Sequence, residues 1–285
     1  MNPLFTSPQC IDFIKHSLQE DIGSGDHSSL ASIPQGTMGK ARLLIKDDGI
    51  IAGLDLARVI FNEVDSSLKV EVLLADGDRV KKGDVGLIVE GSVHSILKSE
   101  RLVLNCMQRF SGIATTTNSM VKLLEGLNTK ILDTRKTTPG LRFLEKWAVT
   151  VGGGYNHRIG LYDMIMLKDN HVDYAGGILA AVERTKKYLA DNELDLKIEV
   201  ETRNLDEVKQ VLDAGGVHRV MFDNFTPQLM KEAVELVAGR METEASGGIT
   251  METVRTYAET GVDYISVGAL THSVKSLDIS LKEFA

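Results

Sequence analysis

The sequence has few cysteines, no long apolar run and no excess of positive charge, and each of these absences excludes a class of protein. Cys10 and Cys106 are its two cysteines. They can form at most one disulfide and lack metal-ligand spacing, which favours a reducing compartment, most simply the cytoplasm. No apolar stretch reaches the ~18 residues that span a bilayer. The start, MNPLFTSPQC, lacks the basic and apolar regions of a signal peptide, so we expect no membrane partner.

The charge balance argues against nucleic acid as a partner. Lys and Arg together number 32 against 40 Asp and Glu, a formal net charge of -8. A general affinity for nucleic acid requires a basic surface, so an anionic ligand must be drawn here by a local cluster of cations. With 285 residues, of which 43% are hydrophobic, the chain can bury the core of one barrel-sized domain or two smaller ones.

The first part of the chain mixes helices and strands. PQCIDFIKHSLQEDIG has helical apolar spacing that stops near Gly23. GKARLLIKDDGIIAG and SLKVEVLLADGDRVKKGDVGLIVEG are typical of short strands joined by glycine-containing turns. A long helical stretch, SVHSILKSERLVLNCMQRFSGIATTTNSMVKLLEG, follows, with a candidate break at Ser111 and Gly112.

From about residue 129 short strands alternate with amphipathic helices. The predicted strands are TKILD, YDMIMLK, LKIEVE, HRVMFD, METEAS and VDYISVG, and the helices include GGILAAVERTKKYLA, NLDEVKQVLDAG, TPQLMKEAVELVAG and TMETVRTYAETG. Repeated strand–helix units imply parallel strands with right-handed crossovers. Because a complete eight-fold barrel needs eight strands, we predict an α/β fold with an incomplete, six-stranded barrel, and a doubly wound open sheet as the second choice.

Charged residues and glycines stand at the carboxyl ends of nearly all these strands, where parallel α/β folds carry their chemistry. They are Asp133 with Arg135 and Lys136, then Lys168 with Asp169, Glu201, Asp223, Ser246 with Gly247 and Gly248, and Gly268. Glu201 and Asp223 could share a hard cation such as Mg²⁺ with a phosphorylated substrate, although each taken singly is equally well explained as a capping carboxylate. Glu199 lies on the same strand face as Glu201 but deeper, and competes with it.

The pair Gly247–Gly248 precedes a predicted helix on the second-last strand. Free backbone amides and a positive helix end there suit a phosphate, and barrels often bind phosphate at this place. The stretch from Arg135 to Lys168 contains six Lys or Arg and two acids, together with His157. Arginine pairs with carboxylates through two parallel bonds, so this stretch predicts a small polyanion that carries carboxylates as well as phosphates. Arg142 and Lys146, four apart, are interpreted as a solvated helix face.

Six of these motifs together resemble the quinolinate phosphoribosyltransferase family (carboxylating nicotinate-nucleotide pyrophosphorylases). They are DTRKTTPGLR, GGGYNHRIGLYDMIMLKDNH, IEVET, MFDNF, ASGGIT and VDYISVGALTHS, and EDIGSGDHSS and ERLVLNCMQRFSGIATTT extend the resemblance into the first half of the chain. The resemblance implies phosphoribosyl transfer from phosphoribosyl pyrophosphate to quinolinate with decarboxylation, giving nicotinate mononucleotide, pyrophosphate and CO2 in NAD biosynthesis. It implies an N-terminal α/β sandwich over residues 1–112, rejoined by about 270–285, and a barrel over 113–269.

The resemblance also assigns roles to residues. It places Arg135, His157, Arg158 and Lys168 around the quinolinate carboxylates, together with Arg101 from a neighbouring subunit. Lys136 and Lys168 would balance charge between the substrates, Glu201 and Asp223 would contact the ribose hydroxyls and Mg²⁺, and the 5-phosphate would lie on Ser246, Gly247, Gly248 and Gly268. A homodimer with shared active sites is implied, and whether dimers form hexamers is left open. GDHSS departs from the threonines usual in the family at that place.

Other functions are compatible with parts of the pattern. Lys168 at a strand end could form a Schiff base, as in a class I aldolase, although the arginines and the two carboxylates would then have no role. A paralogue of the same fold associated with molybdenum transport, a nicotinate-using relative and a non-catalytic phosphosugar-binding module are the remaining alternatives.

Overall fold

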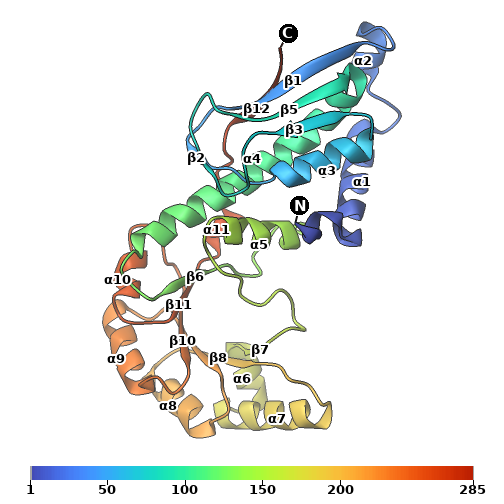
Figure 1. The fold of residues 1–285 in the computed structure, drawn as a ribbon. Coiled ribbons are helices and arrows are strands. Elements are labelled where there is room, and N and C mark those ends of the chain that lie inside the picture. The colour runs from blue at the N-terminus through green and yellow to red at the C-terminus, as the bar shows by residue number, and fades with distance from the viewer. Residues whose placement is uncertain (1, 285) are drawn as a thin grey trace. The chain divides into compact units, whose positions relative to one another are not determined.

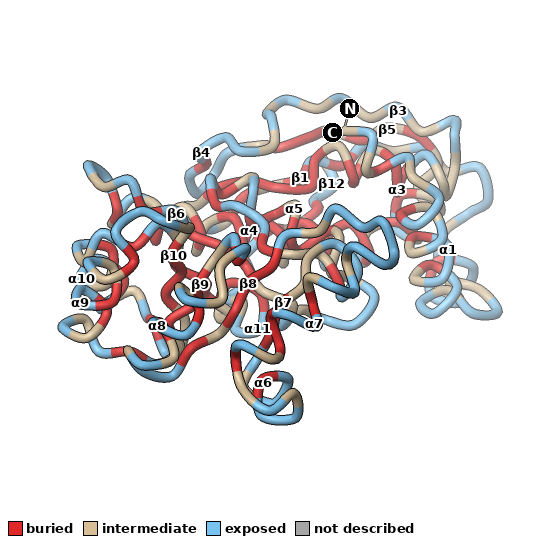
Figure 2. Tube along the Cα trace, turned by 90° about the horizontal axis from the view of Figure 1, so that it is seen from below, coloured by how far each residue is buried: buried red, intermediate tan, exposed pale blue. Residues whose placement is uncertain are grey.

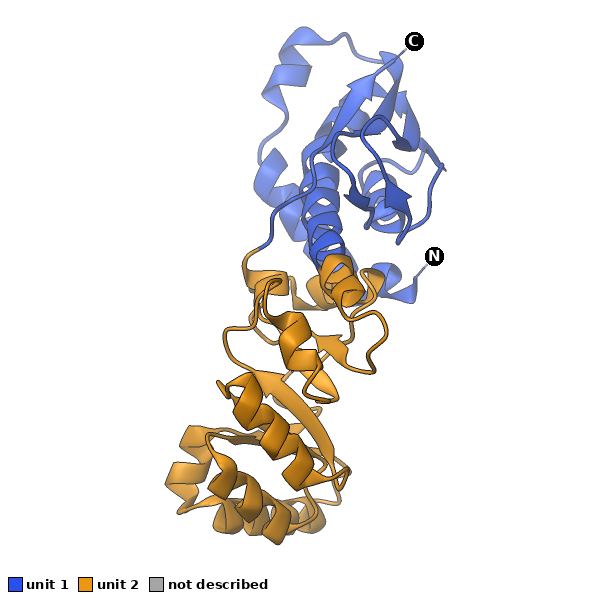
Figure 3. Ribbon diagram, turned by 90° about the vertical axis from the view of Figure 1, so that its left-hand side faces the viewer, with its two compact units in different colours: residues 1–116, 274–285 blue, residues 117–273 orange. Residues whose placement is uncertain are grey.

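An antiparallel sheet organises one unit of the chain and a parallel sheet organises the other. The computed structural model describes residues 2–284. Two compact units can be separated, unit 1 with residues 1–116 and 274–285 and unit 2 with residues 117–273 (Figure 3). None of the helices in the described part of the chain is long and apolar enough to cross a membrane.

Unit 1 is built on a four-stranded antiparallel sheet in the order β12-β1-β5-β3. Its strands are β1 (Met38–Ile45), β3 (Lys69–Val72), β5 (Val85–Ser92) and β12 (Ile279–Glu283), and a small pair is formed by β2 (Gly49–Ile50) and β4 (Arg79–Val80). The last strand, β12, pairs with β1 along five residues (Figure 1). Helices η1 (Pro3–Thr6), α1 (Pro8–Ile22), α2 (His27–Ser32) and α3 (Leu54–Val64) complete this unit with the first part of α4.

Local chemistry fixes the ends of α1. The Ser7 side chain accepts a hydrogen bond from the Cys10 backbone N–H, and Pro8 occupies the first turn, where its missing N–H costs nothing. Gly23 ends the helix with a φ of 52°. The helix and its end at Gly23 were both predicted from the sequence.

Helix α4 (Val93–Leu123) is continuous over 31 residues, so the predicted break at Ser111 and Gly112 is wrong. Both residues serve packing within unit 1. The Ser111 hydroxyl accepts from the Ala52 backbone N–H at 2.9 Å. A Cβ at Gly112 would collide with the Lys275 carbonyl, so glycine here lets a second backbone segment cross the helix closely.

Unit 2 contains a six-stranded parallel sheet in the order β6-β11-β10-β9-β8-β7, which confirms the predicted six-stranded barrel that is open between β6 and β7. The strands are β6 (Lys130–Leu132), β7 (Ile165–Leu167), β8 (Ile198–Thr202), β9 (Arg219–Asp223), β10 (Glu242–Ser246) and β11 (Tyr264–Ser266). All six match strands predicted from the sequence, and buried residues follow them closely (Figure 2).

The connecting helices of unit 2 follow the strands in turn. They are α5 (Arg142–Val151), α6 (Asp169–Ala175), α7 (Ile178–Asp191), α8 (Leu205–Ala214), α9 (Pro227–Val237), α10 (Val254–Ala258) and α11 (Ala269–His272). Helix α10 is shorter than predicted and begins six residues after Gly248. The glycine pair therefore leads into a loop, and the predicted helix end next to Gly248 is wrong.

Candidate active site

The register of the barrel strands aligns the predicted carboxylates. Glu201 of β8 lies opposite Met221 of β9, and Asp223 of β9 lies opposite Ser246 of β10. Because side chains alternate along a strand, Met221 and Asp223 project to the same face of the sheet as Glu201 and Ser246. The structure thus brings these three polar residues to the carboxyl ends of three neighbouring strands.

Lys168 and Glu201 form an ion pair at these strand ends. Nζ of Lys168 lies 3.2 Å from Oε2 of Glu201, and the lysine side chain is 47% exposed whereas that of Glu201 is 11% exposed. Lys168 follows directly after β7, and the imidazole Nδ1 of His171 accepts its backbone N–H at 3.0 Å. A Schiff-base lysine is usually desolvated in an apolar pocket, which this half-exposed, paired ammonium is not.

The backbone next to Asp223 explains why residue 247, the first of the two glycines in the predicted phosphate-binding loop, is a glycine. Asn224 adopts a φ of 57°, donates from its amide to Oδ2 of Asp223 at 2.7 Å, and its backbone N–H bonds to the Ser246 carbonyl at 2.9 Å. A Cβ at Gly247, whose φ is 99°, would collide with the Asn224 side chain. Glycine is required there because the β9 and β10 loops touch through their backbones.

Lys136 lies against Gly268. A Cβ at Gly268 would stand 2.9 Å from Cδ of Lys136, so glycine leaves room for this lysine. The Lys136 carbonyl accepts from the Thr271 hydroxyl at 2.8 Å. The loop after β6 is thereby held next to the end of β11, its neighbour in the sheet.

Arg135 and Arg158 carry two cations close together. Burial lowers the pKa of the Arg158 guanidinium, and repulsion from Arg135 lowers it further. Nη1 of Arg158 donates to the Met164 carbonyl at 3.2 Å. Within residues 2–284 the buried Nε of Arg135 has no hydrogen-bond acceptor. Glu199 and Asp163 oppose both of these effects on the pKa of Arg158. The unsatisfied N–H of Arg135 can take a further acceptor.

Lys146 and Arg142 are not a solvated helix face, and that interpretation is wrong. Lys146 of α5 is 1% exposed and its ammonium pairs with Asp133, which is fully buried at the end of β6. Burial raises the pKa of Asp133 to about 6 against the opposing pull of Lys146, and burial also lowers the pKa of Lys146. Arg142 is half-buried and donates to the Thr137 hydroxyl at 3.0 Å and to the Ile159 carbonyl at 3.2 Å. Both residues organise the loops around the site.

His157 points into a buried group of carboxylates. Its Nε2 lies 3.0 Å from Oε2 of Glu199 and 3.4 Å from Oε2 of Glu244, and both glutamates are fully buried. Glu244 in turn pairs with Nη1 of Arg219 at 2.8 Å. Burial opposes the imidazolium, but pairing with the two carboxylates outweighs it and raises the pKa of His157 to about 9. We call His157, Glu199, Arg219 and Glu244 the inner cluster.

The predicted site residues therefore occupy different kinds of position. We call Arg135, Lys136, Arg158, Lys168, Glu201 and Asp223 the outer group. Five of them lie at the strand ends or in the loops that follow the strands, and Arg158 lies in the loop between α5 and β7. Both ring nitrogens of His157 face protein atoms, since Nδ1 accepts the Arg158 backbone N–H at 2.7 Å. Arg101 is exposed on α4 in unit 1. Sequence analysis missed the pairing of Asp133 with Lys146 and the role of Glu244 and Arg219.

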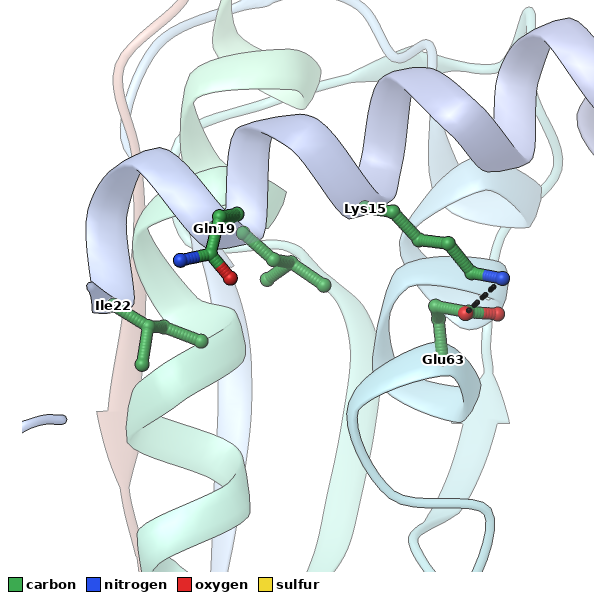
Figure 4. A pocket seen from close by; sticks show the side chains of 5 residues that line it. Lys15, Gln19, Ile22 and Glu63 are labelled. Carbon is green, nitrogen blue, oxygen red and sulfur yellow. Dashed lines mark ion pairs between the residues drawn. The ribbon is translucent and has the colours of Figure 1, made fainter. Parts of the chain in front are cut away.

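Unit 1 has a shallow hollow between α1 and α3 (Figure 4). It is lined by Lys15, Leu18, Gln19, Ile22 and Glu63. Its charged groups are an exposed ion pair in which Nζ of Lys15 lies 3.4 Å from Oε1 of Glu63. Because these two charges neutralise each other in solvent, the hollow does not compete with the barrel as a catalytic site.

Comparison with known proteins gives the chain a family. Residues 26–111 match the model of the quinolinate phosphoribosyl transferase N-terminal domain, and residues 113–282 match that of the C-terminal domain. A quinolinate phosphoribosyltransferase [decarboxylating] 2b, mitochondrial, from Nicotiana tabacum is 50% identical over 95% of this chain and 81% of its own length. A probable nicotinate-nucleotide pyrophosphorylase [carboxylating] from Bacillus subtilis is 43% identical over 94% of this chain and 91% of its own.

A solved structure agrees with these matches. NadC from Streptococcus pyogenes superposes with a TM-score of 0.92 at 39% sequence identity, covering 100% of this chain and 99% of its own. The family indicated by the sequence motifs is confirmed. The chain belongs to the quinolinate phosphoribosyltransferase family.

Proposed function

We propose that this enzyme transfers the phosphoribosyl group of phosphoribosyl pyrophosphate to quinolinate and releases CO2, forming nicotinate mononucleotide and pyrophosphate. The observation that carries the proposal is the buried Nε–H of Arg135 that lacks an acceptor, on the same barrel whose strand ends carry Glu201 and Asp223. A dicarboxylate supplies the negative charge that the arginines lack, and sugar hydroxyls supply donors to the carboxylates.

Quinolinate would bind on the arginine side. The forks of Arg135 and Arg158 would each take a carboxylate, and the buried Nε–H of Arg135 would gain its missing acceptor. Lys168 would lie between the two substrates, and its ammonium would leave the ion pair with Glu201 to pair with a negatively charged group of the substrates.

Phosphoribosyl pyrophosphate would bind across β8 to β11. Glu201 and Asp223 would accept the ribose hydroxyls, and the 5-phosphate would rest on the loop of Ser246, Gly247 and Gly248 and on Gly268. Gly247 and Gly248 both have positive φ, 99° and 61°, which turns successive backbone amides as phosphate-binding loops require. Lys136, beside Gly268, would neutralise the pyrophosphate.

The donor set at these strand ends fits Mg²⁺. Glu201 and Asp223 are carboxylates on one face of neighbouring strands, and Mg²⁺ prefers oxygen ligands shared between protein and phosphate. We propose that these two residues hold the ion. When bound, it would neutralise charge that develops on the leaving pyrophosphate.

The chain's own residues would act by position and charge. The quinolinate nitrogen lone pair forms the bond to C1 of the ribose while the bond from C1 to the pyrophosphate oxygen breaks, and Lys136 and Lys168 stabilise the departing charge. With the ring nitrogen quaternised, the bond from C2 to its carboxylate breaks and CO2 leaves. The electrons stay at C2, next to the positive nitrogen, until a proton is taken up. No protein nucleophile is needed.

A product assay tests this assignment. Purified protein is incubated with quinolinate, phosphoribosyl pyrophosphate and Mg²⁺, and nicotinate mononucleotide is sought by mass spectrometry. Formation with quinolinate but not with nicotinate supports the proposal. Absence of product would favour a paralogue with another substrate or a phosphosugar-binding module. Borohydride trapping with a carbonyl substrate would reveal a Schiff base at Lys168.

We further propose a homodimer in which Arg101 completes the partner's site. Arg101 is exposed on α4, as an arginine that acts outside its own subunit must be. Arg101→Ala homodimers should be inactive, and mixing them with Arg158→Ala subunits should restore part of the activity. Failure of mixing to restore it counts against shared sites. A reducing compartment such as the cytoplasm suits the two buried, free thiols of Cys10 and Cys106; plant relatives carry mitochondrial or chloroplastic labels.

A further inference from the structure

The backbone of His157 is hydrogen-bonded on both sides, and its ring lies against charged and polar groups of the protein. Its backbone N–H donates to Oδ1 of Asp133 at 2.9 Å, and its carbonyl accepts from Nζ of Lys146 at 3.0 Å. Its ring Nδ1 accepts the Arg158 N–H, and Nε2 faces Glu199 and Glu244. A loop residue immobilised at its backbone and at both ring nitrogens can hold its neighbour in one place.

Asp133 and Lys146 supply the backbone part of this anchor. They come from the end of β6 and from α5, and both are almost completely buried. Oriented to suit its neighbours, the Asn156 amide nitrogen lies 2.6 Å from Oδ2 of Asp133 and 2.9 Å from the Lys146 carbonyl. Two successive residues of the loop before Arg158 are therefore tied to a single ion pair.

Stability alone does not account for this ion pair. Taking two charges out of water costs several kcal/mol, and an apolar replacement of similar shape is often as stable or more stable. The pair supplies what an apolar replacement lacks, a charged acceptor for the N–H of His157 and a charged donor for its carbonyl. That arrangement specifies the position of the loop.

The loop position matters because Arg158 and Arg135 repel each other. Without a ligand, like charges at close range favour a conformation in which the two side chains separate. A backbone fixed at His157, with the Arg158 guanidinium bonded to the Met164 carbonyl, resists that separation. A site preorganised in this way does not have to be assembled when the dianion arrives.

We propose that Asp133 and Lys146 are positioning residues of the diacid site, which hold Arg158 next to Arg135 through the backbone of His157. The inference rests on the proposed function in that Arg135 and Arg158 take the quinolinate carboxylates. Both side chains are almost completely buried and are therefore shielded from a substrate, and neither is among the residues proposed to take phosphoribosyl pyrophosphate. Their removal should therefore weaken one substrate selectively.

The double variant Asp133→Asn/Lys146→Met separates positioning from folding. It removes both charges with little change of shape, so the melting temperature should stay within about 5 °C of wild type. We expect the KM for quinolinate to rise about 10- to 100-fold while the KM for phosphoribosyl pyrophosphate changes less than about 3-fold. Titration of quinolinate by calorimetry should show the same weakening. A folded double variant with an unchanged KM for quinolinate would overturn the proposal.

Two further measurements keep the outcome clear. Asn156→Ala removes a donor to Asp133 at an exposed position and leaves no buried charge unpaired. It should raise the quinolinate KM about 3- to 10-fold. An unchanged KM in this variant overturns the proposal even if the double variant does not fold. The matched control is Lys187→Met/Asp191→Asn, an exposed pair on α7, which should leave both KM values unchanged. Wild-type protein that forms no nicotinate mononucleotide refutes the proposed function itself, a result distinct from either.

Discussion

The outer group and the inner cluster are built from charged side chains of the same barrel, yet their charges are satisfied differently. In the inner cluster the charges are buried and face opposite charges of the protein, as with Glu244 between His157 and Arg219, although both oxygens of Glu199 and one of Glu244 make no hydrogen bond within residues 2–284. In the outer group Arg135 has an unsatisfied buried N–H, and Lys168 is half exposed beside Glu201. Charges that are partly exposed are available to substrates, whereas buried charges that face opposite charges of the protein fix shape. The following experiments test that division.

Replacing an outer-group arginine should have the largest effect. Arg135→Ala removes a fork for the diacid, and we expect kcat/KM for quinolinate to fall by about 10³-fold or more while the fold is retained. Steady-state kinetics with a circular dichroism spectrum measure both. Arg255→Ala, which removes an exposed arginine paired with Glu259, is the control and should leave the kinetics unchanged. Wild-type turnover by the Arg135 variant would contradict the assignment of the site.

Replacing an inner-cluster charge should act on stability first. Arg219→Met leaves Glu244 buried beside Glu199 with one cation fewer, and breaking a buried pair in this way costs about 3–5 kcal/mol. Urea denaturation measures the free energy of unfolding. Arg255→Met should cost well under about 1 kcal/mol. A stable variant with impaired quinolinate binding would show instead that the inner cluster takes part in binding.

The inner cluster also predicts a dependence of stability on pH. The pKa of His157 in the folded state, about 9, lies above its ordinary value of 6.5, so folding favours the protonated ring, and protonation of Nδ1 displaces the hydrogen bond that Nδ1 otherwise accepts from the Arg158 N–H. Its contribution is complete below pH 6.5 and is lost as the pH rises through 9. Between pH 7 and 9 the free energy of unfolding should fall by a few kcal/mol at most, since one pKa unit is worth about 1.4 kcal/mol. His157→Gln should flatten this slope; an equal slope in the variant would assign it to other groups.

We expect the smallest effect from a change in the proposed phosphate-binding loop of Ser246, Gly247 and Gly248. Gly247→Ala adds a Cβ that collides with Asn224 at a φ of 99°, so the loop must shift, and the KM for phosphoribosyl pyrophosphate should rise about 10-fold. The quinolinate KM should change little. Gly239→Ala is a matched control, because its φ is also positive, 72°, but a Cβ there meets nothing within 4 Å. If both variants raise the KM for phosphoribosyl pyrophosphate equally, the effect of Gly247→Ala is explained by backbone strain and not by the collision with Asn224.

Sequence patterns predicted the fold well because a strand is recognisable from its own residues and from those that directly flank it. All six barrel strands were predicted from apolar runs bounded by charges or glycines, and the family that the motifs indicate is confirmed, with the reaction it implies. The break in α4 and the length of α10 were wrong. From the sequence alone, Gly112 indicates a break in the helix. Its actual role, to leave room for the backbone at Lys275, depends on a contact between residues far apart in the sequence.

Partners across the fold were beyond the reach of the sequence. Arg142 and Lys146, four residues apart, have the spacing of an exposed helix face, and nothing local shows that Asp133 neutralises Lys146 inside the protein. Glu199 was correctly expected to lie deeper than Glu201, from the period of two alone. Its pairing with His157 required the actual path of the loop after α5.

The pairing of β12 with β1 has a consequence for how the protein is made. Residues 117–273 form a unit from one uninterrupted segment, whereas the sheet of unit 1 waits for residues 279–283 to cover the edge of β1. On the ribosome the barrel unit can therefore fold while the earlier unit still has an unpaired strand edge, so the part synthesised first is completed last.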